Sequence, residues 1–294
     1  MTDFHGYSTR RLSSKLVQVD CLDTAGPRIV RLSYKGSDNL LAELPTASLP
    51  TPHGDYRILG GHRLWHAPEA MPRSYMPDGE GLKTTEVPGG LMLEGTTEKP
   101  TGIRKRIEVR LDPDEAKVTL THTLVNEGSW EVELAPWAIT MFRLGGTAIL
   151  PTRSKDAPAE GLLPDRHLSL WPYTRLDDPR LRLNDGFVRV RPTANMPPLK
   201  IGSLSTEGWI VYWLDGILFR KSFDVFPRMP HPDYDCNAEI YCDNRFVELE
   251  SLGPMSKLPA GGKAQHTETW ELFEGMQQDF LTTEMVRQLS QGPA

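Results

Sequence analysis

The sequence predicts an all-β protein in which large antiparallel sheets stack on one another. Many short segments alternate apolar and polar residues, which is the pattern of strands with one buried face. The chain contains 25 Gly and 25 Pro, which suits frequent turns and disfavours long helices. We expect about fifteen or more strands, too many for one simple sandwich, so the sheets should be large. Because the composition does not shift along the chain, residues 1–294 are predicted to form a single domain.

The predicted strands follow one another along most of the chain. They cover residues 15–19, 28–34, 39–43, 91–95, 103–111, 117–126, 131–135, 137–142, 168–171, 187–191, 199–202, 208–213, 217–223, 238–241, 246–252 and 266–273. Residues 45–90 are dense in Pro, Gly and His, and are predicted to be a long irregular segment with a functional role. Helical spacing is seen over 276–289, which predicts a short C-terminal helix.

Composition excludes several function classes. The net charge of -6 gives no reason to expect nucleic acid or an anionic membrane surface as a partner. No apolar run approaches the ~20 residues that span a bilayer, and residues 1–20 lack the apolar core of a secretory signal, so a cytoplasmic protein is expected. Three cysteines without paired spacing predict neither a disulfide framework nor a zinc site. The sequence has no nucleotide-binding or nucleophile motif, so no cofactor is expected.

The strand at 246–252 places two carboxylates on one face. Alternation puts Phe246, Glu248 and Glu250 on the same side, with the two glutamates about 6.6 Å apart along the backbone. If this face lines a cleft, one of them could act as a general base or bind sugar hydroxyls. If it faces water, the pair is ordinary surface charge.

The segment 60–69 has the composition of a sugar pocket. After two glycines that allow close backbone approach come His62, Arg63, Trp65, His66 and Glu69. Arg and His side chains bind hydroxyls or a carboxylate, and Trp stacks on the apolar face of a sugar ring. His62, His66 and Glu69 could instead ligate a metal, although Pro and Gly disfavour the helix that this spacing suits. A structured loop without a ligand is the third interpretation.

Two further sets of polar residues lie in or next to predicted strands. Asp233, Asp235, Asn237 and Glu239 alternate as calcium ligands would, but the glycine and terminal glutamate of an EF-hand are missing, so an acidic turn is the simpler interpretation. Lys200 and Lys221 each interrupt an apolar strand. A lysine on an inward face needs a partner or a ligand, whereas one on an edge strand protects that edge.

Segments 60–69, 246–254 and 258–262 together resemble a group known as domain of unknown function 4380, which is similar to the galactose mutarotase-like, or aldose 1-epimerase-like, superfamily. The resemblance extends over roughly residues 15–273. It implies a β-supersandwich. In aldose 1-epimerases a catalytic glutamate precedes a turn similar to 258–261, so the resemblance implies that Glu250 is the base. The family's catalytic histidine has no counterpart in 134–142, so His62 or His66 would supply the acid.

These observations predict a carbohydrate-active protein that binds a small-molecule carbohydrate. The leading interpretation is an epimerase or mutarotase-type isomerase. The expected catalytic residues are Glu250, His62 and His66, and the expected substrate-binding residues are Arg63, Trp65, Glu69, Lys200, Lys221, Glu239 and Glu248. One alternative is a carbohydrate-binding module without catalysis. Another is a metal-dependent sugar lyase or isomerase that uses His62, His66 and the segment 233–239.

Overall fold

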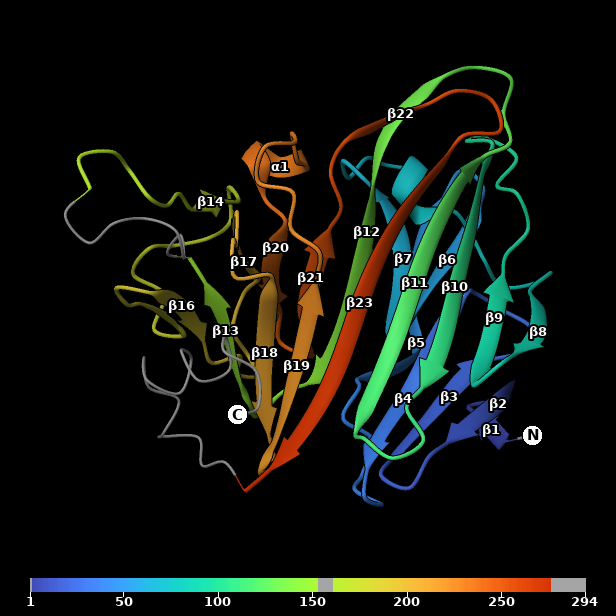
Figure 1. The fold of residues 1–294 in the computed structure, drawn as a ribbon, viewed down its shortest axis with the longest axis horizontal. Helices are drawn as coiled ribbons and strands as arrows, with labels where there is room; N and C mark the ends of the chain where they lie inside the picture. Colours follow the sequence, from blue (N-terminus) through green and yellow to red (C-terminus); the bar gives the residue numbers. More distant parts are fainter. Residues whose placement is uncertain (1, 153–160, 276–294) are drawn as a thin grey trace.

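The computed structural model describes residues 2–152 and 161–275, which form two large antiparallel sheets and one hairpin (Figure 1). The first sheet has eleven strands, in the order β1 (Thr2–Phe4), β2 (Tyr7–Ser13), β3 (Val17–Leu22), β4 (Arg28–Tyr34), β7 (His62–Ala67), β12 (Val132–Arg143), β21 (Phe246–Leu252), β20 (Ala238–Cys242), β17 (Leu199–Ser203) and β14 (Ser169–Leu170), with β22 (Ser256–Leu258) paired to β12. The second has ten, in the order β15 (Leu181–Leu183), β16 (Phe187–Val190), β13 (Thr147–Pro151), β18 (Trp209–Leu214), β19 (Ile217–Phe223), β23 (Lys263–Glu274), β11 (Lys117–Asn126), β10 (Ile103–Leu111), β9 (Gly90–Glu94) and β8 (Lys83–Val87). The hairpin is β5 (Glu43–Thr51) with β6 (Gly54–Gly60).

The two sheets lie face to face, and the main apolar core fills the space between them (Figure 1). Strand β10 shows how the sequence builds this core. Its Ile107 and Val109 are fully buried, while the intervening Glu108 is partly exposed. On β23, which lies two strands away in the same sheet, Trp270 is also fully buried. The alternating pattern therefore gives the predicted all-β sandwich of large antiparallel sheets.

The irregular segment predicted over 45–90 contains strands β5, β6, β7 and β8 and a 3-10 turn at Arg73–Tyr75 instead. Strand β7 has no simple alternation in its sequence because all six residues are buried, polar ones included. Gly60 and Gly61 lead into it with φ of 89° and 69°. A Cβ on Gly60 would lie 2.0 Å from the Ala42 carbonyl oxygen, so this glycine allows two backbone segments to approach closely.

Other local predictions differ from the structure in detail. Leu41, in the predicted strand 39–43, forms an isolated bridge to Phe142, and β5 begins at Glu43. The helix predicted over 276–289 lies outside the described residues. Within the described residues, helix α1 (Pro232–Asp235) spans four residues. No helix in 2–152 or 161–275 is long and apolar enough to cross a membrane.

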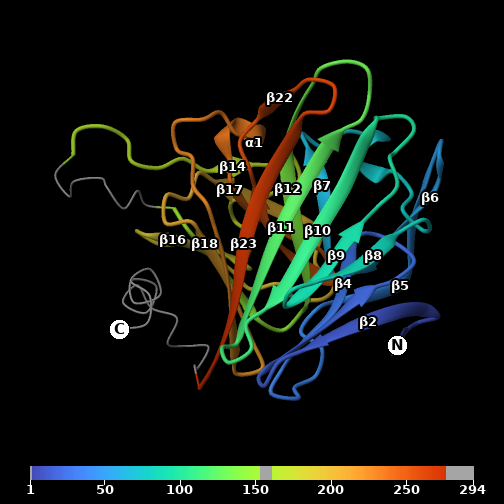
Figure 2. The ribbon, with the colours of Figure 1, turned by 45° about the vertical axis from the view of Figure 1, so that its right-hand side comes forward.

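A second apolar cluster lies on the outer face of the first sheet, which points away from the second sheet. Along β12, Phe142 joins the core between the sheets, whereas Ile139 and Met141 join the outer cluster, as strand alternation requires. Tyr56 and Ile58 pack in this cluster. Both residues belong to the β5–β6 hairpin, which Figure 2 shows at the end of the molecule that holds β2 and β8. The outer face thus combines an apolar floor with a covering hairpin, which is the setting of the pocket described next.

Candidate functional site

A pocket of about 400 Å³ lies on this outer face. Its floor comes from strands β7, β12, β17, β20 and β21, and consists of Arg63, Trp65, Trp137, Ile139, Met141, Lys200, Tyr241, Phe246 and Glu248. The hairpin and the loops supply the rim, which consists of Leu49, Tyr56, Ile58, Glu69, Tyr75, Trp171, Tyr173, Pro198 and Arg245. Its size falls in the usual range for small-molecule sites.

The strand register explains why these side chains meet. Directly paired residues of antiparallel strands point to the same face of the sheet. One row across the first sheet consists of Met141, Glu248, Tyr241 and Lys200. The adjacent row consists of Arg63, Ile139, Glu250 and Glu239. The charged residues singled out from three separate parts of the sequence are therefore neighbours in space.

Arg63 and Glu248 form an ion pair at the pocket. Arg63 Nη2 lies 2.9 Å from Glu248 Oε1, and both side chains are less than 10% exposed. The guanidinium carbon also lies 4.4 Å from the centre of the Trp65 ring, a cation–π contact. Arg63 Nε is buried without a hydrogen-bond partner in the described chain. Since buried donors are normally paired, Arg63 keeps a donor available for a ligand.

Lys200 is the centre of the second ion-pair cluster. Its Nζ lies 2.7 Å from Glu239 Oε2 and 2.9 Å from Glu250 Oε2. The indole N–H of Trp137 donates to the same Glu250 oxygen at 2.7 Å. The ammonium also lies 4.7 Å from the Trp137 ring centre and 4.6 Å from that of Trp171. Aromatic faces and carboxylates therefore hold one buried cation at the pocket wall.

Burial and neighbouring charges shift the pKa values of three groups at the site. Burial raises the pKa of Glu248 to about 7, against the opposing effect of Arg63. Burial likewise raises the pKa of Glu239 well above its usual value, although Lys200 lowers it. Burial alone would lower the pKa of Lys200, but Glu239 and Glu250 outweigh it and hold that pKa well above its usual value. At neutral pH Lys200 is therefore charged and Glu248 is poised between its two forms.

The two strand glutamates differ in their access to the pocket. Phe246, Glu248 and Glu250 share one face as the alternation predicted, and Glu248 lines the pocket. Glu250 is 0% exposed and lies beneath Lys200 and Trp137, to which its Oε2 is bonded. Glu248 is thus the glutamate whose carboxylate reaches the pocket, whereas Glu250 orients the lysine.

His62 and His66 lie on the opposite face of β7 from Arg63 and Trp65. His62 is 0% exposed between the sheets, where its Nε2 lies 2.7 Å from His122 Nε2. His66 is 1% exposed, and its Nε2 lies 3.3 Å from Glu98 Oε2. Alternation explains this placement, because residues 62 and 66 have the opposite parity to 63 and 65. The shared cleft expected for Glu250 with His62 or His66 is therefore absent from the described chain.

Lys221 belongs to the network between the sheets and does not line the pocket. It lies on β19 of the second sheet, 0% exposed, with Nζ 2.8 Å from Glu268 Oε1. The same ammonium donates to the carbonyl oxygens of Leu249 at 2.9 Å and Ala138 at 3.2 Å, which belong to the first sheet. Neither Lys200 nor Lys221 is on an edge strand, so edge protection does not explain them.

The metal ligands expected from the sequence do not come together in one site. Ligand atoms of His62, His122 and Glu268 lie within 4.8 Å of one another between the sheets. There, however, the ammonium of Lys221 already pairs with Glu268, which opposes a second cation. In the segment 233–239, Asp235 accepts the His231 backbone N–H, so it is used to hold the turn. Glu69 lies at the pocket rim beside Tyr75, to which it is hydrogen-bonded.

Sequence reasoning missed most of the aromatic lining. Trp137, Trp171, Tyr173, Tyr241 and Phe246 all line the pocket. Phe246 and Tyr241 could have been found. Phe246 shares the face of Glu248, and a short turn connects its strand to the preceding strand, in which Tyr241 pairs with Glu248. Trp171 and Tyr173 lie in loops around β14, and no periodic signal connects them with the sheet.

No known protein family and no curated protein matches the sequence. Solved structures with the same fold do exist. A galactose mutarotase-like protein from Lactobacillus casei has 11% identity and a TM-score of 0.52, over 90% of this chain and 100% of the other. A proposed aldose 1-epimerase from Escherichia coli has 12% identity and a TM-score of 0.55, over 92% and 100%. Another from Klebsiella pneumoniae has 10% identity and a TM-score of 0.57, over 99% and 84%.

At such low identity these likenesses establish the fold alone. The likeness extends over nine-tenths or more of the chain in each case. It therefore confirms the fold that the resemblance implies, while membership of the superfamily and of the narrower group, domain of unknown function 4380, stays a prediction. The chain has the galactose mutarotase-like, or aldose 1-epimerase-like, β-sandwich fold.

Proposed function

We propose that the outer-face pocket binds a sugar or sugar derivative. The observation that carries this proposal is a pocket in which Arg63, Lys200 and Glu248 lie among the rings of Trp65 and Trp137. Indole faces cover the apolar C–H side of a pyranose, and charged groups bind its hydroxyls. The epimerase and mutarotase names of structural neighbours support the same ligand class.

Glu248 is the residue that we assign to proton transfer. Its carboxyl reaches the pocket, and its pKa of about 7 lets it accept or donate a proton near neutral pH. In a mutarotation it would take the proton of the anomeric hydroxyl while the bond from the anomeric carbon to the ring oxygen breaks. Water would protonate the ring oxygen as this bond breaks, which gives the open-chain aldehyde. After rotation, the same hydroxyl would attack the other face of the carbonyl carbon and release its proton to water, while Glu248 returns the first proton to the anomeric oxygen. Glu250 and Glu239 would hold Lys200 as a hydrogen-bond donor to the sugar.

The test separates Glu248 from Glu250. Anomer interconversion is followed by NMR across a panel of aldoses, above the uncatalysed rate, with wild type, Glu248→Gln and Glu250→Gln. We expect Glu248→Gln to lose 10²-fold or more of the rate constant, on the order of a missing general base, while sugar affinity changes little. Full activity of Glu248→Gln would remove this residue from the mechanism.

A second candidate function is sugar binding without turnover. It is favoured by one observation: no histidine among the described residues lines the pocket, so a histidine acid is missing from its wall. Calorimetric titration with the same panel distinguishes the two functions. Saturable binding with no rate enhancement for any bound sugar would establish the binding module and exclude the isomerase.

A further inference from the structure

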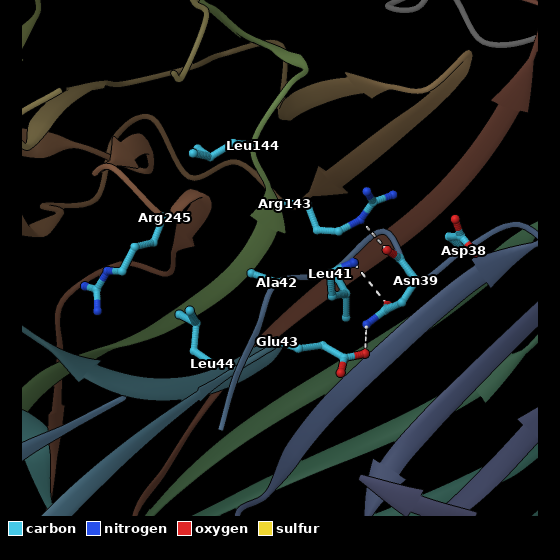
Figure 3. Close-up of a pocket in the computed structure, with 9 residues that line it drawn as sticks. All are labelled: Asp38, Asn39, Leu41, Ala42, Glu43, Leu44, Arg143, Leu144 and Arg245. Atoms are coloured by element: carbon cyan, nitrogen blue, oxygen red, sulfur yellow. Dashed lines mark hydrogen bonds between the residues drawn. The ribbon is translucent and has the colours of Figure 1, made fainter. Parts of the chain in front are cut away.

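A second hollow adjoins the pocket on the same face of the first sheet. It has a volume of about 490 Å³. Figure 3 shows that its lining comes from three places: the segment before and into β5, the end of β12, and the turn between β20 and β21. The lining residues are Asp38, Asn39, Leu41, Ala42, Glu43, Leu44, Arg143, Leu144 and Arg245.

The floor of the pocket continues into this hollow along β12. Residues 137, 139 and 141 line the pocket, and Arg143, which is next in the same parity, lines the hollow. Arg245 borders both spaces. The Ala42 N–H of the hollow donates to the Met141 carbonyl of the pocket floor at 2.9 Å. Ala42 and Leu44 also belong to the same apolar cluster as the pocket floor. The two spaces are therefore consecutive parts of one groove.

The groove is longer than a single sugar ring requires. Positions 137 and 143 of β12 are six residue steps apart, which at about 3.4 Å per residue is ~20 Å of strand. Among the described residues, the lining of its far half contains no aromatic ring, but Leu44 and Leu144 provide apolar surface there beside the guanidinium groups of Arg143 and Arg245. Arg143 is held by the Asn39 carbonyl at 2.6 Å and Asp215 at 3.0 Å, so its orientation is fixed. Each guanidinium has more N–H donors than these contacts use.

We infer that the ligand is an oligosaccharide of at least two units, with one unit in the pocket and the next against Leu44, Leu144 and Arg143. Arg245 lies at the junction, where it can bind hydroxyls of both units. This inference rests on the proposed function, since it extends the same site. It separates this chain from a protein that acts on free monosaccharides.

The experiment compares sugars of increasing length on the intact protein. Glucose, maltose and maltotriose form one series, and galactose with β-1,4-galactobiose forms another, each titrated by calorimetry. The expected result is a Kd at least tenfold lower for a disaccharide than for its monosaccharide. Arg143→Met removes a guanidinium group from the hollow, and Leu144→Asp removes an apolar side chain from it. Each variant should abolish this gain while leaving monosaccharide affinity unchanged, because neither residue lines the pocket. Near-UV circular dichroism identifies whichever of the two variants keeps the native fold.

Three outcomes decide the matter. Equal affinity for monosaccharide and disaccharide overturns the inference and leaves the proposed function standing. A disaccharide gain that persists in a folded Arg143→Met or Leu144→Asp variant places the second unit elsewhere and also overturns it. Absence of binding by every sugar, short or long, refutes the proposed function itself.

Discussion

Replacing Lys200 by Met tests the charge arrangement beneath the pocket. Lys200 is 3% exposed, and its ammonium is the counterion of Glu239 and Glu250, both 0% exposed. Removing one partner of a buried ion pair leaves an uncompensated charge and costs about 3–5 kcal/mol of unfolding free energy. Loss of the contacts with two indole rings adds about 1 kcal/mol. We therefore expect Lys200→Met to be about 4–6 kcal/mol less stable than wild type at pH 8.

The same variant should recover stability at acid pH. Without the lysine, the folded protein must keep one more proton on the Glu239–Glu250 pair than wild type does, whereas the unfolded chain releases it above its ordinary carboxyl pKa. A folded state that binds more protons than the unfolded state loses stability as pH rises, by about 1.4 kcal/mol per pH unit for one proton. The destabilisation should therefore be smaller at pH 5 than at pH 8 by up to about 4 kcal/mol.

Urea titrations at pH 5, 6, 7 and 8 measure both quantities. Lys257→Met is the matched control, because Lys257 is an exposed strand lysine in β22, and it should change the unfolding free energy by no more than about 0.5 kcal/mol. A cost below about 1 kcal/mol for Lys200→Met, or a cost independent of pH, would contradict the buried charge cluster.

Three further predictions follow from the described contacts. Because the pKa of Glu248 is raised from 4.5 to about 7, wild type should lose about 3 kcal/mol more stability than Glu248→Gln as pH rises between these values; identical pH dependence in urea titrations would refute it. Gly60→Ala should destabilise far more than Gly36→Ala, since both have positive φ but a Cβ at Gly60 meets the Ala42 carbonyl whereas that at Gly36 meets open space; equal melting temperatures would contradict this. Lys221→Met should cost about 3 kcal/mol or more by leaving its buried carboxylate partner unpaired, and a neutral result would show that this carboxyl is protonated.

The fold could be predicted from the sequence because strand alternation reports burial directly. Where a strand is buried on both faces the signal disappears, and β7 shows the consequence. Its residues His62, Arg63 and His66 look like a polar loop, yet all of them are buried in a central strand. The pairing partners of β7 are β4 and β12, which lie far away in the sequence, and no local pattern specifies such partners.

Some residues of the candidate pocket were singled out from the sequence, but their arrangement was not. Arg63, Trp65, Glu69, Lys200 and Glu248 line the pocket as expected of substrate-binding residues. The face of the strand on which each of the other predicted residues lies depends on whether its number is odd or even. This parity places the histidines of β7 on the inner face, and the choice between Glu248 and Glu250 depends on which side chain Trp137 and Lys200 cover. That depends on register between four strands, which spacing within one strand cannot supply.

The most direct test of the central claim is a tryptophan-fluorescence titration of the protein with monosaccharides and their matched disaccharides. Trp65, Trp137 and Trp171 line the pocket, so a sugar that enters it changes their emission. We predict a saturable change for at least one sugar, with a smaller amplitude in Trp171→Phe because one of the three indoles is removed. The loop position of Trp171 makes this substitution mild for folding. No saturable change with any sugar, or binding with undiminished amplitude in that variant, would contradict a carbohydrate site in this pocket.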